Sequence, residues 1–244
     1  MEIKVLASSS KGNCYFISDG VSNLLIEAGI SLRRIRKEVD LLSLTGCLIT
    51  HEHQDHSAFA KDVAKYCKIY SSEHTLELLN FENYSYNKKP IKTKQVYIIG
   101  SFKIIAFSTQ HDAIDPFGYL ISSTVLNENL LFATDTYYIN LRFKDLHYIM
   151  IECNYQKEIL YKNIGRGNML KVNANRLLKS HMELETTKDF LNAQDLSKTK
   201  QIYLTHLSDG NSDEKLFKRE IQAITGKEVI VCKREWKYGR KENV

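Results

Sequence analysis

The sequence predicts an α/β fold in which two mixed β-sheets pack face to face and helices cover their outer surfaces. Three observations lead to this prediction. Short runs rich in β-branched and aromatic residues form two series along the chain, helix-like apolar spacing lies between and after them, and no linker-like stretch divides the 244 residues. Since the chain has only two prolines, eleven glycines and no internal repeat, we expect one domain over residues 1–244.

The first part of the chain alternates short strand and helix signals. The first thirty residues contain the runs KVLAS, NCYFIS and NLLIEAG, separated by the polar stretches SSSKG and DGVS, which is typical of a meander. Apolar spacing over residues 31–44 favours a helix, and so does that over 57–67, which follows a loop rich in His and Asp. Further strand signals follow at KIYSS, QVYIIG, FKIIAFST, FGYLISST and NLLFATD.

The remaining part of the chain carries longer helical segments between its strands. The runs YIMIEC, QIYLTHL and EVIVCK predict strands. A basic region from about 156 to 194 and a second segment near 213–225 have helical spacing. In such a sandwich the functional residues lie in loops at the strand ends, so we expect them there.

The composition excludes several classes of protein. A hydrophobic content of 43% and a charged content of 26% are those of a folded globular chain, not of a disordered, collagen-like or coiled-coil protein. No apolar run approaches the ~20 residues of a membrane-spanning helix, and the start, MEIKVLASSSKG, lacks the pattern of a secretory signal. We therefore expect a cytoplasmic protein without a membrane partner. The net charge of +5 favours an anionic partner only weakly.

The cysteines and two of the histidines predict no chemistry of their own. The five cysteines lie far apart and form no C-x-x-C pair, so we expect them to be reduced and buried rather than part of a disulfide framework or a zinc ribbon. His74 and His147 lie outside any motif, and we expect both to be structural or exposed. The cysteines are Cys14, Cys47, Cys67, Cys153 and Cys232.

The strongest chemical signal is the motif HEHQDH at residues 51–56, directly after the apolar run GCLIT. In extended backbone leaving a strand, residues i and i+2 point to the same side, so His51 and His53 can hold one cation. Asp55 and His56 come where the chain turns into a helix, and they can serve a second cation. Imidazole combined with carboxylate suits Zn²⁺, Mn²⁺ or Fe²⁺ better than Ca²⁺ or Mg²⁺ alone.

Three more candidate ligands stand at the ends of predicted strands. His111 follows FKIIAFSTQ, Asp135 follows NLLFAT and His206 follows QIYLT. Each of them alone would be an ordinary polar residue at a strand end. Together with the motif they could converge on one rim, where a carboxylate such as Asp135 can bridge two cations ~3.5–4 Å apart, the separation that two-metal hydrolases use.

This order of residues resembles the metallo-β-lactamase superfamily, in which H-x-H-x-D-H is followed by a lone His, a lone Asp and a last His. The resemblance spans most of the chain and implies a four-layer αβ/βα sandwich. It also implies two metal sites that share one carboxylate. The implied ligands are His51, His53 and His111 for one metal, Asp55, His56 and His206 for the other, and Asp135 between them.

Finer features resemble the YycJ (WalJ) group of this superfamily, whose members are metal-dependent exonucleases acting on DNA 5′ ends. Similar small members occur in phage recombination modules, which implies a phage origin and a single-strand annealing recombinase as partner. One departure is Glu27, because the family has an Asp there that orients metal-binding residues. The matching segments are SSSKGNCYFI, HDAIDPFGYLI, IECNY, SHMELETTKDFL and THLSDGNSD.

The resemblance therefore implies a DNA exonuclease that digests double-stranded DNA 5′ to 3′ in recombination or repair. Two divalent ions, Zn²⁺ or Mn²⁺ with Fe²⁺ as a further fit, would lower the pKa of a bound water and neutralise charge on the phosphoryl oxygens. We expect Asp55 also to hold or accept the proton of that water. His181, in a segment resembling the place of a non-ligand histidine in related nucleases, would protonate the leaving oxygen, and Glu152 would keep it protonated.

Other polar and basic residues are candidates for binding the nucleic acid. Asn154 and Ser208 could donate hydrogen bonds to phosphate, and the loop that ends at Asn13 could do so with its backbone N–H groups. Basic residues are dense over 157–179, including Lys171 and Arg176, which fits either a phosphate-backbone track or an ordinary solvated helix. The tail 233–241 mixes cations with aromatic residues and could contact DNA or simply fray.

Two alternative functions stay open from the sequence. An RNA-processing endonuclease of the tRNase Z type is one, although the chain lacks a Gly/Pro-rich arm and an H-E-A-T motif. The other is a non-catalytic, metal-stabilised DNA-binding accessory module. Against the latter, the pattern supplies seven ligands, whereas structural zinc sites are usually closed by four.

Overall fold

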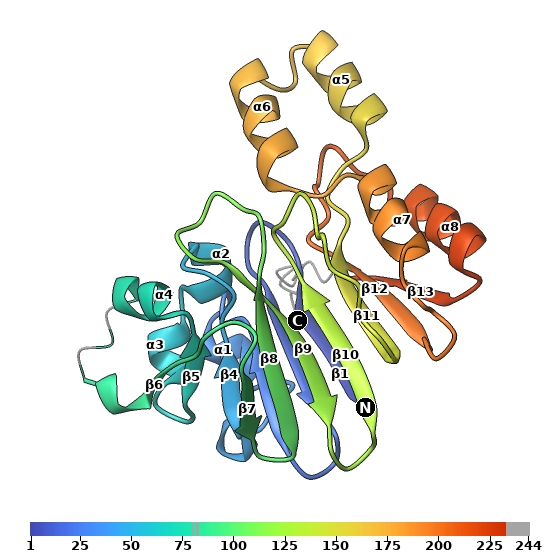
Figure 1. Ribbon diagram of the computed structural model, residues 1–244. Coiled ribbons are helices and arrows are strands. Elements are labelled where there is room, and N and C mark those ends of the chain that lie inside the picture. Colours follow the sequence, from blue (N-terminus) through green and yellow to red (C-terminus); the bar gives the residue numbers. More distant parts are fainter. Residues whose placement is uncertain (80, 82, 233–244) are drawn as a thin grey trace, which may run out of the picture.

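The computed structural model describes residues 1–79, 81 and 83–232, and Figure 1 shows their arrangement. Two β-sheets, of six and seven strands, pack face to face, and helices lie on the outside of both. The predicted architecture of two mixed sheets flanked by helices is therefore confirmed. The basic tail 233–241 lies outside the described residues. Within the described ranges, no helix combines the length and the apolar content needed to cross a bilayer.

The first sheet has the strand order β1-β2-β3-β4-β5-β6. Strands β1 to β3 pair antiparallel and form the predicted meander, whereas β3 to β6 pair parallel. Strand β6 was not predicted, because Lys88, Lys89 and Pro90 carry no apolar signal. The bounds are β1 (Glu2–Ala7), β2 (Cys14–Ser18), β3 (Asn23–Ile26), β4 (Gly46–Leu48), β5 (Ile69–Ser71) and β6 (Lys88–Pro90).

The second sheet has the strand order β13-β12-β11-β10-β9-β8-β7. Strands β7 to β10 pair antiparallel, and β10 to β13 pair parallel. Because parallel strands end at the same edge, the loops after β10, β11 and β12 lie next to one another. The bounds are β7 (Val96–Ile99), β8 (Phe102–Ser108), β9 (Phe117–Ser123), β10 (Glu128–Ala133), β11 (Leu146–Glu152), β12 (Gln201–Thr205) and β13 (Glu228–Val231).

The helices are shorter than their sequence spacing predicts. The segment 31–44 forms only one helical turn and a 3₁₀ turn, and the basic region 156–194 is divided into three helices. Gly167, with φ +74°, follows the first of the three, and extended backbone at His181 ends the second. The bounds are α1 (Leu32–Ile35), η1 (Leu41–Ser43), α2 (Gln54–Ser57), α3 (Ala60–Val63), α4 (Glu73–Leu78), η2 (Ser85–Asn87), α5 (Lys157–Gly165), α6 (Lys171–Ser180), α7 (Leu184–Asn192) and α8 (Glu214–Thr225).

Three large apolar clusters separate four layers. One lies between the first sheet and its helices, one between the two sheets, and one between the second sheet and helices α7 and α8. The middle cluster contains large side chains such as Phe102, Tyr119 and Phe132. As predicted, the five cysteines are free and buried.

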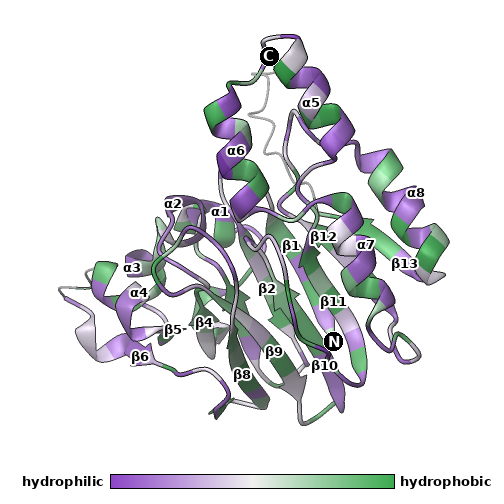
Figure 2. Cartoon of the chain, turned by 45° about the horizontal axis from the view of Figure 1, so that its top comes forward, coloured by the Kyte–Doolittle hydropathy of each residue, from purple (hydrophilic) through white to green (hydrophobic). Residues whose placement is uncertain are grey.

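Helices α5 and α6 stand apart from these layers. They form a hairpin that projects beyond the sheets, and many of its residues are hydrophilic (Figure 2). A small apolar cluster of its own, built around Tyr155, Leu160 and Ala174, holds the hairpin together. Its position places α6 over the edge of the second sheet at which the parallel strands end (Figure 1).

Two segments, the loop before β2 and the chain after β3, pack directly on the HEHQDH segment. The backbone N–H of Asn13 donates to the carbonyl oxygen of Asp55 at 2.7 Å, and that of Ala28 donates to His56 at 2.7 Å. A Cβ atom on Gly29 would lie 1.7 Å from the Asp55 carbonyl oxygen and 2.8 Å from the Asn13 nitrogen. Only glycine therefore fits at residue 29, and this close contact positions the motif.

Replacing Gly29 by alanine tests this contact. We expect Gly29→Ala to lower the free energy of unfolding by about 1–3 kcal/mol, because the backbone of the motif must move away. Thermal unfolding followed by circular dichroism measures the change. The matched control is Gly165→Ala, since a Cβ there meets open space, and it should be neutral or stabilising by up to about 1 kcal/mol. Equal melting temperatures for the two variants would contradict the packing argument.

Candidate metal centre

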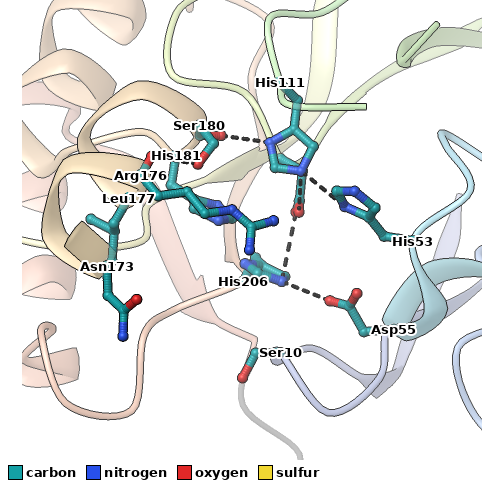
Figure 3. A pocket seen from close by; sticks show the side chains of 11 residues that line it. Ser10, His53, Asp55, His111, Asn173, Arg176, Leu177, Ser180, His181 and His206 are labelled. Carbon is teal, nitrogen blue, oxygen red and sulfur yellow. Dashed lines mark hydrogen bonds and ion pairs between the residues drawn. The ribbon is translucent and has the colours of Figure 1, made fainter. Parts of the chain in front are cut away.

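Loops from both sheets bring the predicted ligands together. The HEHQDH segment follows β4, His111 follows β8, Asp135 follows β10 and His206 follows β12. Their donor atoms form two groups, within each of which all atoms lie no more than 4.8 Å apart. Asp135 belongs to both groups, and Figure 3 shows residues of both around one pocket. The groups are His51, His53, His111 and Asp135, and Asp55, His56, Asp135 and His206.

In each of two histidines, one ring nitrogen is held by a hydrogen bond and the other is directed into the cluster. His51 Nδ1 lies 2.8 Å from Thr50 Oγ1, and within the described chain the buried Nε2 of His51 has no hydrogen-bond partner. His111 donates from Nδ1 to the Ser180 carbonyl oxygen at 2.8 Å, which leaves a lone pair on Nε2. A metal ligand needs this arrangement, with one nitrogen oriented by the protein and the other free to coordinate.

The nitrogen atoms also lie close to one another. His111 Nε2 is 3.2 Å from His53 Nδ1 and 3.4 Å from Asp135 Oδ2. Two imidazole lone pairs at this distance repel each other unless a proton or a cation lies between them. The mixed nitrogen and oxygen donors suit Zn²⁺, Mn²⁺ or Fe²⁺. The residues therefore fit divalent metal ions.

The charges of the cluster also favour a cation. Burial opposes ionisation of Asp135, yet the rings of His206 and His56 hold its pKa well below the usual range. Burial likewise opposes protonation of His206, but Asp135, Asp55 and Glu152 raise its pKa to about 10. The carboxylates thus hold protons on neighbouring imidazoles, and a divalent cation would take the place of those protons.

Three residues of the cluster adopt the left-handed backbone conformation. Glu27 has φ 63°, Asp135 has φ 46° and His206 has φ 53°. This region is uncommon for residues other than glycine, and it costs of the order of 1–3 kcal/mol for each residue, which contacts with the surroundings must offset. For His206 the surroundings include Asn154, which donates from Nδ2 to the His206 carbonyl oxygen at 2.6 Å and lies 3.1 Å from its Nδ1. The strain therefore lies at two candidate ligands, Asp135 and His206, and at Glu27, which supports two others.

Glu27 stands where the resemblance implies an Asp, and it contacts residues that belong to or support both ligand groups. It is fully buried and accepts hydrogen bonds from Thr50 Oγ1 at 2.6 Å and from the Thr50 backbone N–H at 3.3 Å. Its Oε1 also lies 3.4 Å from His56 Nδ1. Since Thr50 in turn contacts His51, the longer side chain of Glu27 supports one histidine of each group.

A carboxylate–imidazole pair lies beside the ligands. Glu152 is fully buried, and His181 Nδ1 donates to its Oε1 at 2.6 Å. Its Oε2 accepts from the backbone N–H groups of Thr136 at 2.8 Å and Met182 at 3.2 Å. Burial opposes protonation of His181, but the charge and hydrogen bond of Glu152 outweigh it and raise the pKa of His181. The donor atoms of Glu152, Asp135 and His206 also lie within 4.8 Å of one another. Because both oxygens of Glu152 already accept hydrogen bonds, we interpret Glu152 as the partner of His181 rather than as a metal ligand.

A cavity of about 400 Å³ opens above the ligands (Figure 3). One of its walls is a single face of α6, formed by residues with the helical spacing i, i+3, i+4 and i+7, namely Asn173, Arg176, Leu177 and Ser180. Of these four, only Arg176 was a candidate from the sequence, although the helical spacing of all four just before His181 is present there. The other lining residues are Ser10, His53, Asp55, His111, Asp135, His181 and His206.

Three residues expected to bind phosphate have other contacts. Asn13 is fully buried, and its Nδ2 lies 3.1 Å from His56 Nε2 and 3.3 Å from Asp55 Oδ2. Asn154 is buried against His206, and the Ser208 hydroxyl oxygen accepts hydrogen bonds within its own loop from Asn211. These side chains thus support ligands or a loop and do not line the cavity, and the backbone N–H of Asn13 is bonded to the Asp55 carbonyl oxygen. Phosphate binding by these three residues stays a prediction.

The remaining candidates lie as follows. Lys171 is exposed at the start of α6 and does not line the cavity, whereas Arg176 does. His74 is exposed and lies 3.6 Å from Asp115, and His147 Nδ1 accepts a backbone hydrogen bond from Asn129. Neither histidine belongs to the cluster, in agreement with the sequence analysis.

Comparisons with known proteins agree with this geometry. Residues 10–136 match the sequence model of the metallo-beta-lactamase superfamily. The chain is 27% identical over 243 residues to Exodeoxyribonuclease YycJ of Bacillus anthracis, covering 92% of this chain and 89% of that protein. It is 29% identical over 233 residues to Exodeoxyribonuclease WalJ of Streptococcus pneumoniae, covering 87% of this chain and 83% of that protein.

Solved structures show the same fold at low sequence identity. The metallo-beta-lactamase fold protein YhfI from Bacillus subtilis superposes with a TM-score of 0.72 at 16% identity, over 96% of both chains. Human tRNase Z, short form, superposes with a TM-score of 0.62 at 15% identity, over 95% of this chain and 96% of that one. Because the family match covers more than half of the residues, the chain belongs to the metallo-β-lactamase superfamily.

Proposed function

We propose that this chain is a dinuclear metal-dependent phosphodiesterase and, more specifically, a DNA exonuclease. The observation that carries the proposal is the pair of ligand groups sharing Asp135 in an open cavity, with the Glu152–His181 pair beside them. A purely structural metal site would need neither an open cavity nor a shared carboxylate. The exodeoxyribonuclease names of relatives that cover most of both chains support nucleic acid as the substrate.

Bound divalent ions, Zn²⁺ or Mn²⁺ with Fe²⁺ as a further fit, would supply an activated water and neutralise the phosphoryl oxygens. The chain's own residues would orient and move the protons. Asp55 lines the cavity, with Oδ2 3.2 Å from His206 Nε2, and its carboxylate can hold the proton of the attacking water. In His181, Nδ1 is bonded to Glu152, so Nε2 is the atom that can protonate the leaving oxygen.

The charge distribution supports a nucleic-acid substrate. Residues 157–180, which form the α5–α6 hairpin, contain six Lys or Arg and one Glu, a formal charge of +5. This equals the net charge of the entire chain, so the residues outside the hairpin contain equal numbers of basic and acidic side chains. A basic hairpin beside the cavity is suited to follow a phosphate backbone.

The finer assignments rest on the resemblance to the YycJ/WalJ-like family. We propose digestion of double-stranded DNA in the 5′ to 3′ direction, a role in recombination or repair, and a single-strand annealing recombinase as partner of a phage-encoded protein. A panel of end-labelled single-stranded DNA, duplex DNA and tRNA precursor measures the substrate preference. Preferential cleavage of the tRNA precursor would favour an RNA-processing endonuclease instead.

The role of Asp55 is tested by replacing it with alanine. With Mn²⁺ the unaltered protein should release nucleotides from end-labelled duplex DNA, and chelation by EDTA should abolish the release. Asp55→Ala should lower the rate by about 10²-fold or more, because a ligand and a proton acceptor are both lost. Asp189→Ala, at an exposed position on α7, is the control. Equal release by both variants would show that the nucleotides are not released at this site, and it would favour the non-catalytic DNA-binding module.

The role of His181 is tested by changing the leaving group. His181→Ala should lower kcat for an oligonucleotide about 10²–10⁴-fold, because its alkoxide must be protonated as it leaves. The loss should be much smaller for bis(p-nitrophenyl) phosphate, whose phenolate leaves without a proton. Steady-state kinetics with both substrates measure the difference. The same fractional loss on both would show that His181 is not the acid.

The hairpin is tested by the salt dependence of DNA binding. We expect the double variant Lys162→Glu, Lys171→Glu to weaken binding and to flatten the plot of log K against log salt by about one unit per lost phosphate contact. Fluorescence anisotropy in EDTA measures binding without cleavage. The control is Lys215→Glu, Lys218→Glu on α8, which makes the same charge change away from the cavity. An unchanged slope would remove the hairpin from the DNA interface.

A further inference from the structure

Arg176 is the single lysine or arginine among the described residues that line the cavity. It projects from the α6 face that forms one wall, opposite the loops that carry His53 and Asp55 (Figure 3). Its side chain is 69% exposed, so a bound molecule can reach it. The other basic residues of the hairpin lie outside the cavity, which sets Arg176 apart from a diffuse basic surface.

Asp112 holds this guanidinium in place. Arg176 Nε donates to Asp112 Oδ2 at 2.6 Å, and Asp112 Oδ1 lies 3.2 Å from His111 Nε2. Asp112 therefore connects the hairpin to the loop that carries a candidate metal ligand. Its position next to His111 in the sequence gave no sign of this contact, because the partner lies 64 residues further along the chain.

The contact leaves most of the guanidinium free to bind an anion. Arginine has five N–H donors, and the bond from Nε uses one of them. The two terminal amino groups retain four donors in a planar fork, which matches the oxygens of a phosphate. Asp112 thus fixes the direction of the fork while leaving its donors open toward the cavity.

The size of the cavity indicates which phosphate is bound. The phosphate to be cleaved must lie at the ligand groups around Asp135, on the cavity floor. A volume of about 400 Å³ is at the lower end of the range for small-ligand pockets, enough for about one nucleotide. A longer strand must therefore extend beyond the ligand groups, and a side chain on the α6 wall is in a position to reach its next phosphate.

We propose that Arg176 binds the phosphate adjacent to the cleaved one, and that Asp112 is the positioning residue that presents it. This inference rests on the proposed phosphodiesterase function and specifies its substrate as a strand carrying at least two phosphates. Arg176 is then a specificity-determining residue that distinguishes an oligonucleotide from a small phosphodiester.

The test compares a short oligonucleotide with bis(p-nitrophenyl) phosphate, which has one phosphate. With Mn²⁺, Arg176→Ala should lower kcat/KM about tenfold more for the oligonucleotide than for the small diester, mainly through KM, because a charge-assisted hydrogen bond is lost. Asp112→Asn should give about a threefold difference, because an exposed ion pair only positions the side chain. The double variant should match Arg176→Ala alone, since both changes act through one side chain.

The matched control is Arg166→Ala, which removes the same charge from the far end of the same hairpin, outside the cavity. If Arg166→Ala lowered kcat/KM for the oligonucleotide as much as Arg176→Ala, the effect would come from the overall charge of the hairpin, and the proposal would be overturned. Equal losses on both substrates would place Arg176 at the cleaved phosphate and overturn it as well. Thermal unfolding of all variants separates these outcomes from a loss of stability.

A binding measurement separates this inference from the proposed function. In EDTA, the Kd of a fluorescein-labelled oligonucleotide should rise about tenfold for Arg176→Ala and clearly less for Arg166→Ala. If the unaltered protein hydrolyses neither substrate, the phosphodiesterase proposal fails, whereas the binding comparison still decides the role of Arg176. Equal Kd values for the unaltered protein and Arg176→Ala would overturn that role.

Discussion

The structure depends on one electrostatic constraint, the burial of Asp135 at the junction of the two sheets. Its carboxylate lies within reach of histidines from both ligand groups, and burial of an unpaired charge there would be costly. The surrounding imidazoles, and the cations they fit, compensate this charge. Asp135 and His206 have a left-handed backbone, and His51 Nε2 has no hydrogen-bond partner among the described residues. Both features fit a cluster arranged around positive charge rather than around its own hydrogen bonds.

The residues around the ligands decide how the rings are oriented. Thr50 and Glu27 orient His51 and approach His56, Asn13 contacts the Asp55–His56 segment, and Asn154 holds His206. These polar side chains are buried, so the loss of a hydrogen-bond partner would leave each of them unsatisfied and would destabilise the cluster. In this way Asn13 and Asn154, which the sequence made candidates for phosphate binding, contact candidate ligands. Glu27 stands where the resemblance implies an Asp, and its carboxylate reaches both Thr50 and His56.

Helix α6 links the substrate side of the cavity to its metal side. Its last residue, Ser180, accepts the hydrogen bond that orients His111, and the next residue, His181, pairs with Glu152. One turn earlier, Arg176 contacts Asp112. A short helix outside the main layers thus positions a candidate ligand, a candidate acid and a candidate phosphate-binding side chain, which gives the basic hairpin a role beyond its charge.

Local spacing in the sequence was enough to predict the meander, the ends of most strands and metal binding by the HEHQDH segment. The reason is that backbone geometry alone fixes how neighbouring side chains are directed. Resemblance added the grouping of the ligands, and the structure brings the same residues together. Tertiary structure alone decided the contact between Asp112 and Arg176, the burial of Asn13, the division of residues 156–194 into three helices and the α6 wall of the cavity. Those features arise from the packing of segments that are far apart in the chain. The residue pattern within one segment does not determine which other segment it packs against.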